Sequence, residues 1–470
     1  MTATDHRPSP VGAATGSFLV EEGTEWYRID DFDRLDPFLV SVVSATDQWM
    51  FVSSSGALTA GRVSAGSAVF SYETDDRLHR SGGLQGPITL VRVGDEVWEP
   101  FAPHAPFGQV RRSIAKTAMG DRLRFEEHHA GLGLTFRATW APSHRFGFVR
   151  TCELLSETSL EVELLDGLVD VLPAGVDLPS QQTSSTLVDA YRRSELDPSG
   201  IGVFSLEALV SDRAEPAESL RASVVWSTGL DDAVVALSDA QLRAFRSGEA
   251  LVPEHLVKGR KGSYLLAHRM AVDPAAPLRW SIVVDVERDQ GALAELRTWL
   301  RTADDPASVV AESIEATSAG LVDVVGRADA VQETADRASS VHHLANVLFN
   351  VMRGGVFLDD HRIVVADVQQ FVDDRNRAAA ERFRAVAAGL PPVVEVTELR
   401  EAVSGDPDLE RLAAEFLPLS FSRRHGDPSR PWNTFRISVR SEAGELTHGY
   451  EGNWCDIFQN WDALLHSYPE

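Results

Sequence analysis

The pattern of apolar residues changes once along the sequence, near Gln290, from one typical of strands to one typical of helices. This change limits the fold more than any other feature. Residues 18–286 are short runs rich in Val, Phe, Leu and Trp, separated by clusters of Gly, Ser, Asp and Pro, which is typical of β-strands. In residues 132–140 (LGLTFRATW) apolar side chains alternate with period two, as in an antiparallel strand with one buried face. Strands without interleaved helices predict an antiparallel β-sandwich rather than a parallel α/β sheet.

Beyond Gln290 the apolar residues follow the helical period. Asp305 and Pro306 are expected as the N-cap and first residue of the second helix. The predicted helices span 293–303, 307–325, 330–350, 365–388, 396–403, 408–416 and 454–466, with a hairpin at 434–450 and short helical insertions in the β-rich part at 186–196 and 238–247.

The predicted fold class is therefore a β + α multidomain chain. A disordered tail (1–16) precedes the antiparallel β-sandwich (17–288), a helical linker (289–328) and the start of a helical domain (329–470). An amphipathic helix must bury its apolar stripe, and this last region has no obvious closing element. We expect an incomplete helical domain, with a small self-contained bundle as the alternative.

Composition excludes several classes of protein. With 43% hydrophobic and 24% charged residues the chain is globular rather than disordered. Its net charge of −26 argues against nucleic acid or an anionic membrane surface as partner. Two cysteines, Cys152 and Cys455, are too few for a disulfide framework or a four-cysteine zinc site. Without a signal peptide or a membrane-spanning apolar run, we expect a cytoplasmic protein with reduced thiols and no membrane partner.

Common catalytic motifs are missing from the sequence. It has no GxxxxGK[ST], GxGxxG, HExxH, GxSxG or CxxC, which disfavours P-loop, Rossmann, zincin and α/β-hydrolase chemistry. Two adjacent histidine pairs occur at 128–129 and 342–343. Neighbouring side chains on a strand or helix point apart, so neither pair is expected to bind a metal, and no metal site is predicted.

The segment 420–435 (SFSRRHGDPSRPWNTF) is the densest polar stretch. Its prolines restrict the backbone, which predicts a stiff loop. Guanidinium groups bind phosphate oxygens in two-point fashion, and an indole offers a flat face to a sugar. The loop could instead be an ion-paired structural element. Its candidate substrate-binding residues are Arg423, Arg424, His425, Arg430 and Trp432.

A second polar cluster lies at 450–470. Asp456, Gln459 and Asn460 have the spacing i, i+3, i+4 and share one face of the predicted helix. Together with the indole of Trp454, a carboxylate and two amides suit a hydroxyl-rich ligand. An ordinary acidic helix N-terminus is the alternative interpretation.

A third segment, 350–363, contains Gly355 as the expected end of a helix and the adjacent carboxylates Asp359 and Asp360. Paired carboxylates perform acid/base work in glycosidases. Because adjacent residues diverge in space, we interpret this pair as turn acids.

The domain order and the motif at 455–460 resemble the cellobiose-phosphorylase-like glycoside phosphorylases of the six-hairpin glycosidase group. The sugar-binding helix of that family carries Arg-Asp-x-x-Gln-(Asp/Asn), and residues 455–460 read Cys-Asp-Ile-Phe-Gln-Asn. The resemblance implies that the helical domain begins an (α/α)6-type barrel. It also implies that Asp456 binds sugar hydroxyls and that Gln459 orients the sugar, whereas Cys455 lacks the guanidinium of the family's arginine.

The resemblance further implies a reaction without a cofactor. Inorganic phosphate is the co-substrate and nucleophile, so no general base is needed, and one carboxylic acid protonates the leaving oxygen. The family's general acid lies farther along the barrel, so we expect it beyond residue 470 and assign no catalytic residue here. Oligosaccharide and phosphate are the expected partners, and because sandwiches of this family often form dimer surfaces, so is a homodimer.

Three functional hypotheses follow. The first is the N-terminal part of a carbohydrate-active enzyme, either phosphorylase-like on β-linked glucosides or hydrolase-like, with little or no turnover by this chain alone. The second is a non-catalytic carbohydrate-binding protein, and the third is an interaction module without sugar chemistry. The first two depend on the arginine loop and the Asp456 helix converging on one cavity.

Overall fold

The computed structural model describes residues 13–82, 85–103, 108–209, 219–359, 361–420, 426–437, 439, 447 and 457–468. The chain divides into two compact units. The sandwich unit comprises Met1–Ala319 and Gly426–Phe435, and the helical unit comprises Gly320–His425 and Arg436–Glu470. Their boundary falls inside a helix, within the stretch 289–328 that the sequence predicts as a linker.

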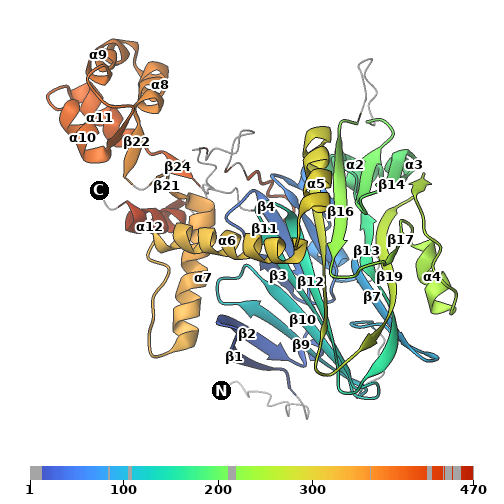
Figure 1. Cartoon of the computed structure of the whole chain (residues 1–470). Coiled ribbons are helices and arrows are strands. Elements are labelled where there is room, and N and C mark those ends of the chain that lie inside the picture. The colour runs from blue at the N-terminus through green and yellow to red at the C-terminus, as the bar shows by residue number, and fades with distance from the viewer. Residues whose placement is uncertain are drawn as a thin grey trace, which may run out of the picture. The chain divides into compact units, whose positions relative to one another are not determined.

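Three antiparallel sheets build the sandwich unit within the described residues (Figure 1). The largest has the strand order β1-β2-β9-β10-β11-β12-β20-β16-β15-β14-β18. Its strands are β1 (Thr15–Glu21), β2 (Thr24–Asp30), β9 (Val110–Thr117), β10 (Leu123–His129), β11 (Leu134–Ser143), β12 (Gly147–Ser156), β14 (Arg192–Leu196), β15 (Gly202–Leu206), β16 (Arg221–Thr228), β18 (Leu256–Lys258) and β20 (Leu278–Asp289).

The two smaller sheets have the orders β17-β19-β13-β7-β8 and β3-β4-β5-β6. Their strands are β3 (Leu39–Val42), β4 (Gln48–Ser53), β5 (Leu58–Arg62), β6 (Ala68–Phe70), β7 (Gly86–Val93), β8 (Glu96–Trp98), β13 (Leu160–Val171), β17 (Val234–Ala236) and β19 (Gly262–Val272). The helices of this unit are η1 (Phe32–Arg34), η2 (Ala65–Ser67), α1 (Asp75–Leu78), α2 (Leu178–Thr183), α3 (Ser185–Tyr191), α4 (Ala240–Arg246) and α5 (Gln290–Thr302), followed by α6 (Pro306–Gly326), which continues into the helical unit.

One apolar core joins the three sheets, as a sandwich requires. It contains Phe136 and Trp140 of the largest sheet, Leu164 of the second and Met50 of the third. In β11 the residues Leu134, Phe136, Ala138 and Trp140 are buried and the residues between them are half-exposed. The structure thus confirms the period-two strand and the antiparallel sandwich that the sequence predicts.

The helical unit consists of short helices with two small two-stranded sheets, β21-β24 and β22-β23, in its described part. Helix α7 packs with α12, and α8 packs with α9. The elements are α7 (Arg337–Gly354), β21 (Val356–Phe357), β22 (Arg362–Val364), α8 (Val365–Arg375), α9 (Arg377–Ala387), β23 (Val393–Glu395), α10 (Val396–Ala402), α11 (Pro407–Glu415), β24 (Leu419–Ser420) and α12 (Ile457–Ser467). Whether these helices begin an (α/α)6 barrel stays a prediction.

Three predicted helices need correction. The helix expected over 365–388 is two helices, because the Asn376 side chain accepts a bond from the amide of Ala379 (3.1 Å) and caps α9 where α8 ends. The helix expected from Ala330 begins at Arg337, capped by Asp336. The insertion expected over 186–196 is helical to Tyr191 and then continues as β14.

Other local predictions are confirmed. Helix α6 begins at Pro306, and the Asp305 carboxylate accepts a bond from the amide of Ser308 (3.0 Å), which is the predicted N-cap. Helix α7 ends before Gly355, whose φ of +80° favours glycine. Strand β1 begins at Thr15, two residues inside the expected tail, and most of the expected hairpin at 434–450 lies outside the described residues.

None of the described helices combines the length and apolar character needed to cross a bilayer.

Candidate functional site

A cavity of about 480 Å³ opens in the helical unit between α8, α12 and the segment that joins α11 to β24. We call it the α8–α12 groove. It is lined by Asp367, Gln370, Phe371, Asp374, Arg375, Glu415, Phe416, Leu417, Leu419 and Trp461.

One face of α8 supplies the polar wall of the α8–α12 groove. Asp367, Gln370, Phe371 and Asp374 have the spacing i, i+3, i+4, i+7, which places their side chains on one side of a helix. The opposite side of α8 carries Val368 and Val372, which are buried in the unit's core. Burial of that apolar stripe therefore fixes which side chains face the groove.

Aromatic rings form the rest of the wall. Phe371 and Phe416 meet edge to face with ring centroids 5.2 Å apart, and the Arg375 guanidinium lies 3.6 Å from the centroid of Phe371. Trp461 of α12 is 39% exposed, although it is a large apolar side chain. A partly exposed indole beside a cavity can stack on the C–H face of a sugar ring.

Some polar groups of the groove already have hydrogen-bond or ion-pair partners. The Gln370 amide donates to Asp374 Oδ1 (2.9 Å), and Glu415 pairs with Arg411 (2.6 Å). Asp367 makes no hydrogen bond or ion pair with another residue of the part described. A half-buried carboxylate that keeps its acceptor capacity, beside an amide and a partly exposed indole, suits a ligand with several hydroxyl groups.

The predicted site residues are divided between the two units or fall outside the described residues. Gln459 is exposed on α12, and Asn460 belongs to the same helix. Arg430 and Trp432 belong to the sandwich unit, where Trp432 is 74% exposed. Arg423, Arg424, His425, Trp454 and Asp456 lie outside the described residues. The convergence of the arginine loop and the Asp456 helix stays a prediction.

Sequence reasoning missed the α8 wall. The signal was present in VADVQQFVDDR, where acids and amides recur with helical spacing around one phenylalanine. What the sequence could not give is the neighbour, because Trp461 lies far along the chain from Asp367. Asp359 is not among the residues that line this groove. It has a φ of +60° and pairs with Arg362 at 3.6 Å, and Asp360 lies outside the described residues.

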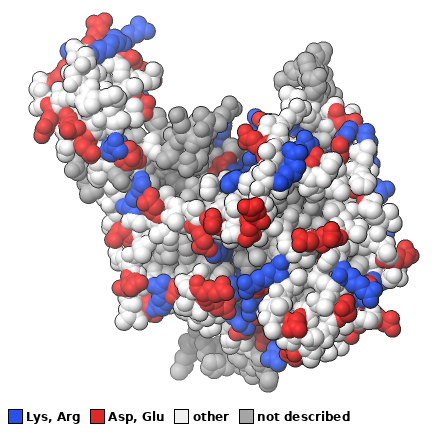
Figure 2. Space-filling model, in the orientation of Figure 1, with Lys and Arg blue, Asp and Glu red and all other residues white. Residues whose placement is uncertain are grey.

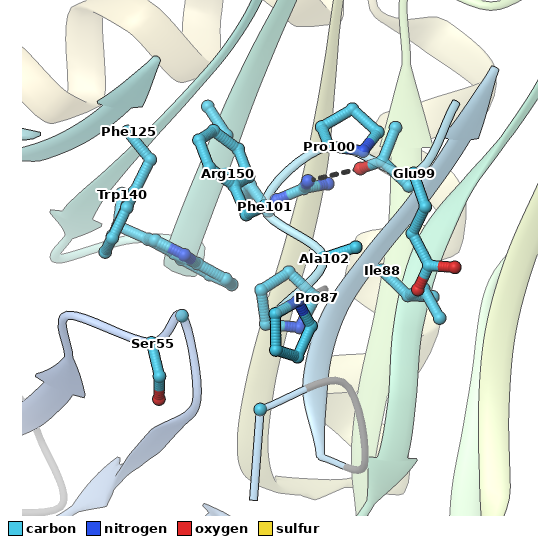
Figure 3. Close-up of a pocket in the computed structure, with 15 residues that line it drawn as sticks. Ser55, Pro87, Ile88, Glu99, Pro100, Phe101, Ala102, Phe125, Trp140 and Arg150 are labelled. Carbon is cyan, nitrogen blue, oxygen red and sulfur yellow. Dashed lines mark hydrogen bonds between the residues drawn. The ribbon is translucent and has the colours of Figure 1, made fainter. Parts of the chain in front are cut away.

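A second, smaller cavity lies in the sandwich unit (Figure 3), with a volume of about 70 Å³. Phe101, Phe125, Trp140 and Arg150 are among its lining residues, and Ser55 is drawn at a turn opposite them. By the same measure this cavity offers far less room for a ligand than the groove of about 480 Å³. The α8–α12 groove is much larger and is the better candidate for a saccharide.

Arg150 in that smaller cavity is bound to the sandwich core through both of its terminal nitrogens. One terminal nitrogen bonds both carboxylate oxygens of Asp166 (2.8 Å each), and the other bonds Thr89 Oγ1 (2.9 Å), the contact dashed in Figure 3. Trp280 Nε1 also donates to Asp166 (2.7 Å). Burial opposes the charge of Arg150, but Asp166 outweighs that effect and raises the arginine pKa. This arrangement neutralises a buried charge, and of the guanidinium nitrogens only Nε has no hydrogen-bond partner among the described residues.

The loop beside the cavity is held in a strained conformation. Phe101 has a φ of +64°, which a bulky residue rarely adopts. Its amide donates to Glu127 Oε2 (2.8 Å), and Trp98 Nε1 donates to the other oxygen (2.7 Å). Arg112 bonds Glu127 (2.7 Å) and the carbonyl of Ala102 (2.7 Å). These contacts to the fully buried Glu127 carboxylate hold the loop in its strained backbone conformation.

A polar groove of about 450 Å³ lies on the face of the largest sheet. Its charges pair with one another: Arg279 with Glu153 (2.7 Å), Arg122 with Glu315 (2.7 Å), and Arg124 with Glu21. Acidic and basic side chains are likewise interspersed over the surface shown in Figure 2. Groups that already satisfy each other make this groove a weaker candidate than the α8–α12 groove.

The two side chains of the histidine pair on β10 point to opposite faces of the sheet, as strand geometry predicts. His129 is buried and its Nδ1 accepts from the amide of Leu132 (3.2 Å), whereas His128 points to the other face and contacts Thr135 (3.0 Å). In the part of the chain that the structure describes, no three His, Cys, Asp or Glu side chains gather as metal ligands.

Comparisons with known proteins give only structural likenesses. No protein-family model and no curated protein matches the sequence. A bacterial glucoamylase in complex with acarbose has a TM-score of 0.40 at 9% identity, with 80% of this chain and 57% of that chain covered. A protein described as a kojibiose phosphorylase, from the human microbiome, has a TM-score of 0.34 at 9% identity, with 77% and 41% covered.

A third structure, a GalM/aldose epimerase homologue from C. elegans, has a TM-score of 0.32 at 8% identity; the match covers 54% of this chain and all of the homologue. This chain thus spans just over half of the glucoamylase and less than half of the phosphorylase. Such distant likenesses transfer no activity, and the specific resemblance to cellobiose-phosphorylase-like enzymes stays a prediction.

Proposed function

We propose that this chain binds a neutral saccharide in the α8–α12 groove, as part of a carbohydrate-active protein. The observation that carries the proposal is the juxtaposition of Asp367 and Gln370, on one face of α8, with the partly exposed indole of Trp461 on α12. Carboxylate and amide groups bond vicinal hydroxyls, and the indole covers an apolar sugar face.

The charge of the groove favours a neutral ligand. Among the described residues that line it are the three carboxylates of Asp367, Asp374 and Glu415 and one guanidinium, that of Arg375. The whole chain carries a net charge of −26. An anionic saccharide would therefore meet repulsion at close range, whereas hydroxyl groups can donate to these carboxylates.

In the fuller form of the proposal, the chain is the N-terminal part of a glycoside phosphorylase-like enzyme that acts on β-linked glucosides. Phosphate would then be held by the arginine-rich loop at 420–435, and the general acid would come from sequence beyond residue 470. The alternative is a carbohydrate-binding protein without catalysis. Because little or no turnover is expected of this chain alone, calorimetric titration with inorganic phosphate in the presence of cellobiose or laminaribiose separates the two: only a phosphorylase-like chain should bind phosphate.

Replacing Trp461 by alanine tests the binding site. We expect the affinity for cellobiose or laminaribiose, measured by isothermal titration calorimetry, to fall about tenfold, since a ring face that contacts the sugar contributes on the order of 1.4 kcal/mol. Phe349→Ala, on α7 of the same unit, is the matched control because Phe349 is a similarly exposed aromatic residue (38%) outside the groove. The affinity of the Phe349→Ala variant for the disaccharide should equal that of the unchanged chain.

Two results would contradict the proposal. One is an absence of heat with glucose, cellobiose and laminaribiose at millimolar concentration. The other is an equal loss of affinity in the Trp461 and Phe349 variants, which would indicate a general defect of the helical unit rather than a contact with the ligand.

A further inference from the structure

The largest sheet of the sandwich unit has two very different edges. At one end, β18 has only three residues and ends in Lys258. At the other end, β1 has seven residues, TGSFLVE, with no Lys, Arg or Pro. The edge strands of the other two sheets, β3, β6, β8 and β17, have three or four residues each. Among the described residues, β1 is the longest sheet edge of this unit.

Natural proteins protect sheet edges because unpaired N–H and C=O groups attract another strand. Short edges, lysines and prolines are the usual protection, and β18 shows two of them. Strand β1 shows none, and its Val20 is 69% exposed. The neighbouring aromatic pair Phe18 and Tyr27, with centroids 5.0 Å apart, extends this apolar surface.

The hairpin geometry tells which backbone groups of β1 are available. Glu21 and Thr24 flank a two-residue turn whose residues, Glu22 and Gly23, both have positive φ. In such a hairpin the flanking pair exchanges hydrogen bonds. Alternation then directs the N–H and C=O groups of Gly16, Phe18 and Val20 away from β2, toward the open edge.

We propose that this edge pairs with β1 of a second copy of the chain, antiparallel about a two-fold axis at Phe18. In this register Phe18 faces Phe18 of the copy and Gly16 faces Val20, and these are the residues whose backbone groups point outward. The two sheets would join into one continuous sheet through an isologous contact.

The composition of β1 favours a second copy over an unrelated strand. Glu21 is the only charged residue of the strand. In the Phe18-centred register it lies opposite Thr15, so the contact places no carboxylate against its own copy. Val20 lies opposite Gly16, where the side chain of Tyr27 covers the place that a Gly16 side chain would take. The strand can therefore pair with its own copy without placing like charges against each other.

Replacing Val20 by proline tests this pairing. Proline removes the outward N–H but none of the bonds from β1 to β2, as edge strands tolerate. Because of the two-fold symmetry two hydrogen bonds are lost, and we expect the dimer dissociation constant to rise at least about tenfold. The matched control Val20→Ala keeps the N–H and should keep the dimer. Sedimentation velocity of the whole chain over a concentration series measures both.

Circular dichroism and thermal melting check that the proline variant remains folded. Hydrogen exchange on the unchanged chain gives a second measurement, since the amides of Phe18 and Val20 should gain protection as its concentration rises. A monomer at all concentrations, or a dimer equally strong in the proline variant, would overturn the proposal. A monomer that gains protection at β1 only when another peptide is added would also overturn it and would assign the edge to a foreign strand.

Discussion

Replacing Asp166 by asparagine is expected to lower the free energy of unfolding of the sandwich unit by about 3–5 kcal/mol. Asp166 is fully buried and binds the buried guanidinium of Arg150 with both oxygens, while Thr89 (2.6 Å) and Trp280 (2.7 Å) donate to it as well. Asparagine removes the charge that neutralises Arg150 and presents an amide to several donors. A buried cation then lacks compensation, and this is the costly outcome.

Denaturant unfolding followed by tryptophan fluorescence measures this loss. Glu161→Gln is the matched control, because Glu161 lies exposed on the same strand, β13, and should change stability by less than about 0.5 kcal/mol. The double variant Arg150→Met with Asp166→Leu should be more stable than Asp166→Asn, since it removes both charges together. Near-wild-type stability of Asp166→Asn would show that the pair does not carry this energy.

The second large effect is expected at Asp285, which links β20 to β5. Arg62 donates to it through Nε (2.6 Å) and Nη2 (3.2 Å), and Arg288 donates through Nε (2.7 Å). Burial alone would raise the pKa of Asp285, but Arg62 and Arg288 outweigh burial and hold the pKa below its ordinary value. We expect Asp285→Asn to cost about 3 kcal/mol at pH 7.

The same shift predicts a pH dependence. A carboxyl group whose pKa is lowered by folding contributes its full stability above the unfolded pKa of about 3.9 and loses it as the pH falls through the folded value. The wild-type chain should therefore lose more stability between pH 5 and acid than Asp285→Asn loses. Asp231→Asn, at an exposed aspartate, is the control and should follow the wild-type curve. Parallel curves for all three chains would contradict this assignment.

The sequence predicted the fold wherever a local pattern determines the structure. The period-two run of β11 and the Asp305–Pro306 helix start need only neighbouring residues. The ion pairs of the core could not be predicted, because Arg150 and Asp166 lie on different sheets and meet only after the sheets pack. The single helix predicted over 365–388 failed because the capping bond of Asn376 overrides good helix formers on both sides.

In the candidate site, too, features set by neighbouring residues could be predicted, whereas contacts between distant residues could not. The helix at 457–467 agrees with the helix predicted over 454–466, whereas the sugar-binding role predicted for Gln459 stays a prediction. The acids and amide of α8 share a helix face that the sequence already contains, but nothing in the chain order connects Asp367 with Trp461. A groove made by segments distant in sequence becomes visible only in three dimensions.

Hydrogen–deuterium exchange with and without a saturating disaccharide tests the central claim most directly. If a neutral saccharide binds the α8–α12 groove, cellobiose or laminaribiose should slow exchange in peptides that cover α8 (Val365–Arg375) and α12 (Ile457–Ser467). Peptides from the sandwich strands β10 to β12 should not change. Protection confined to the sandwich unit, or no protection at saturating sugar, would contradict the account.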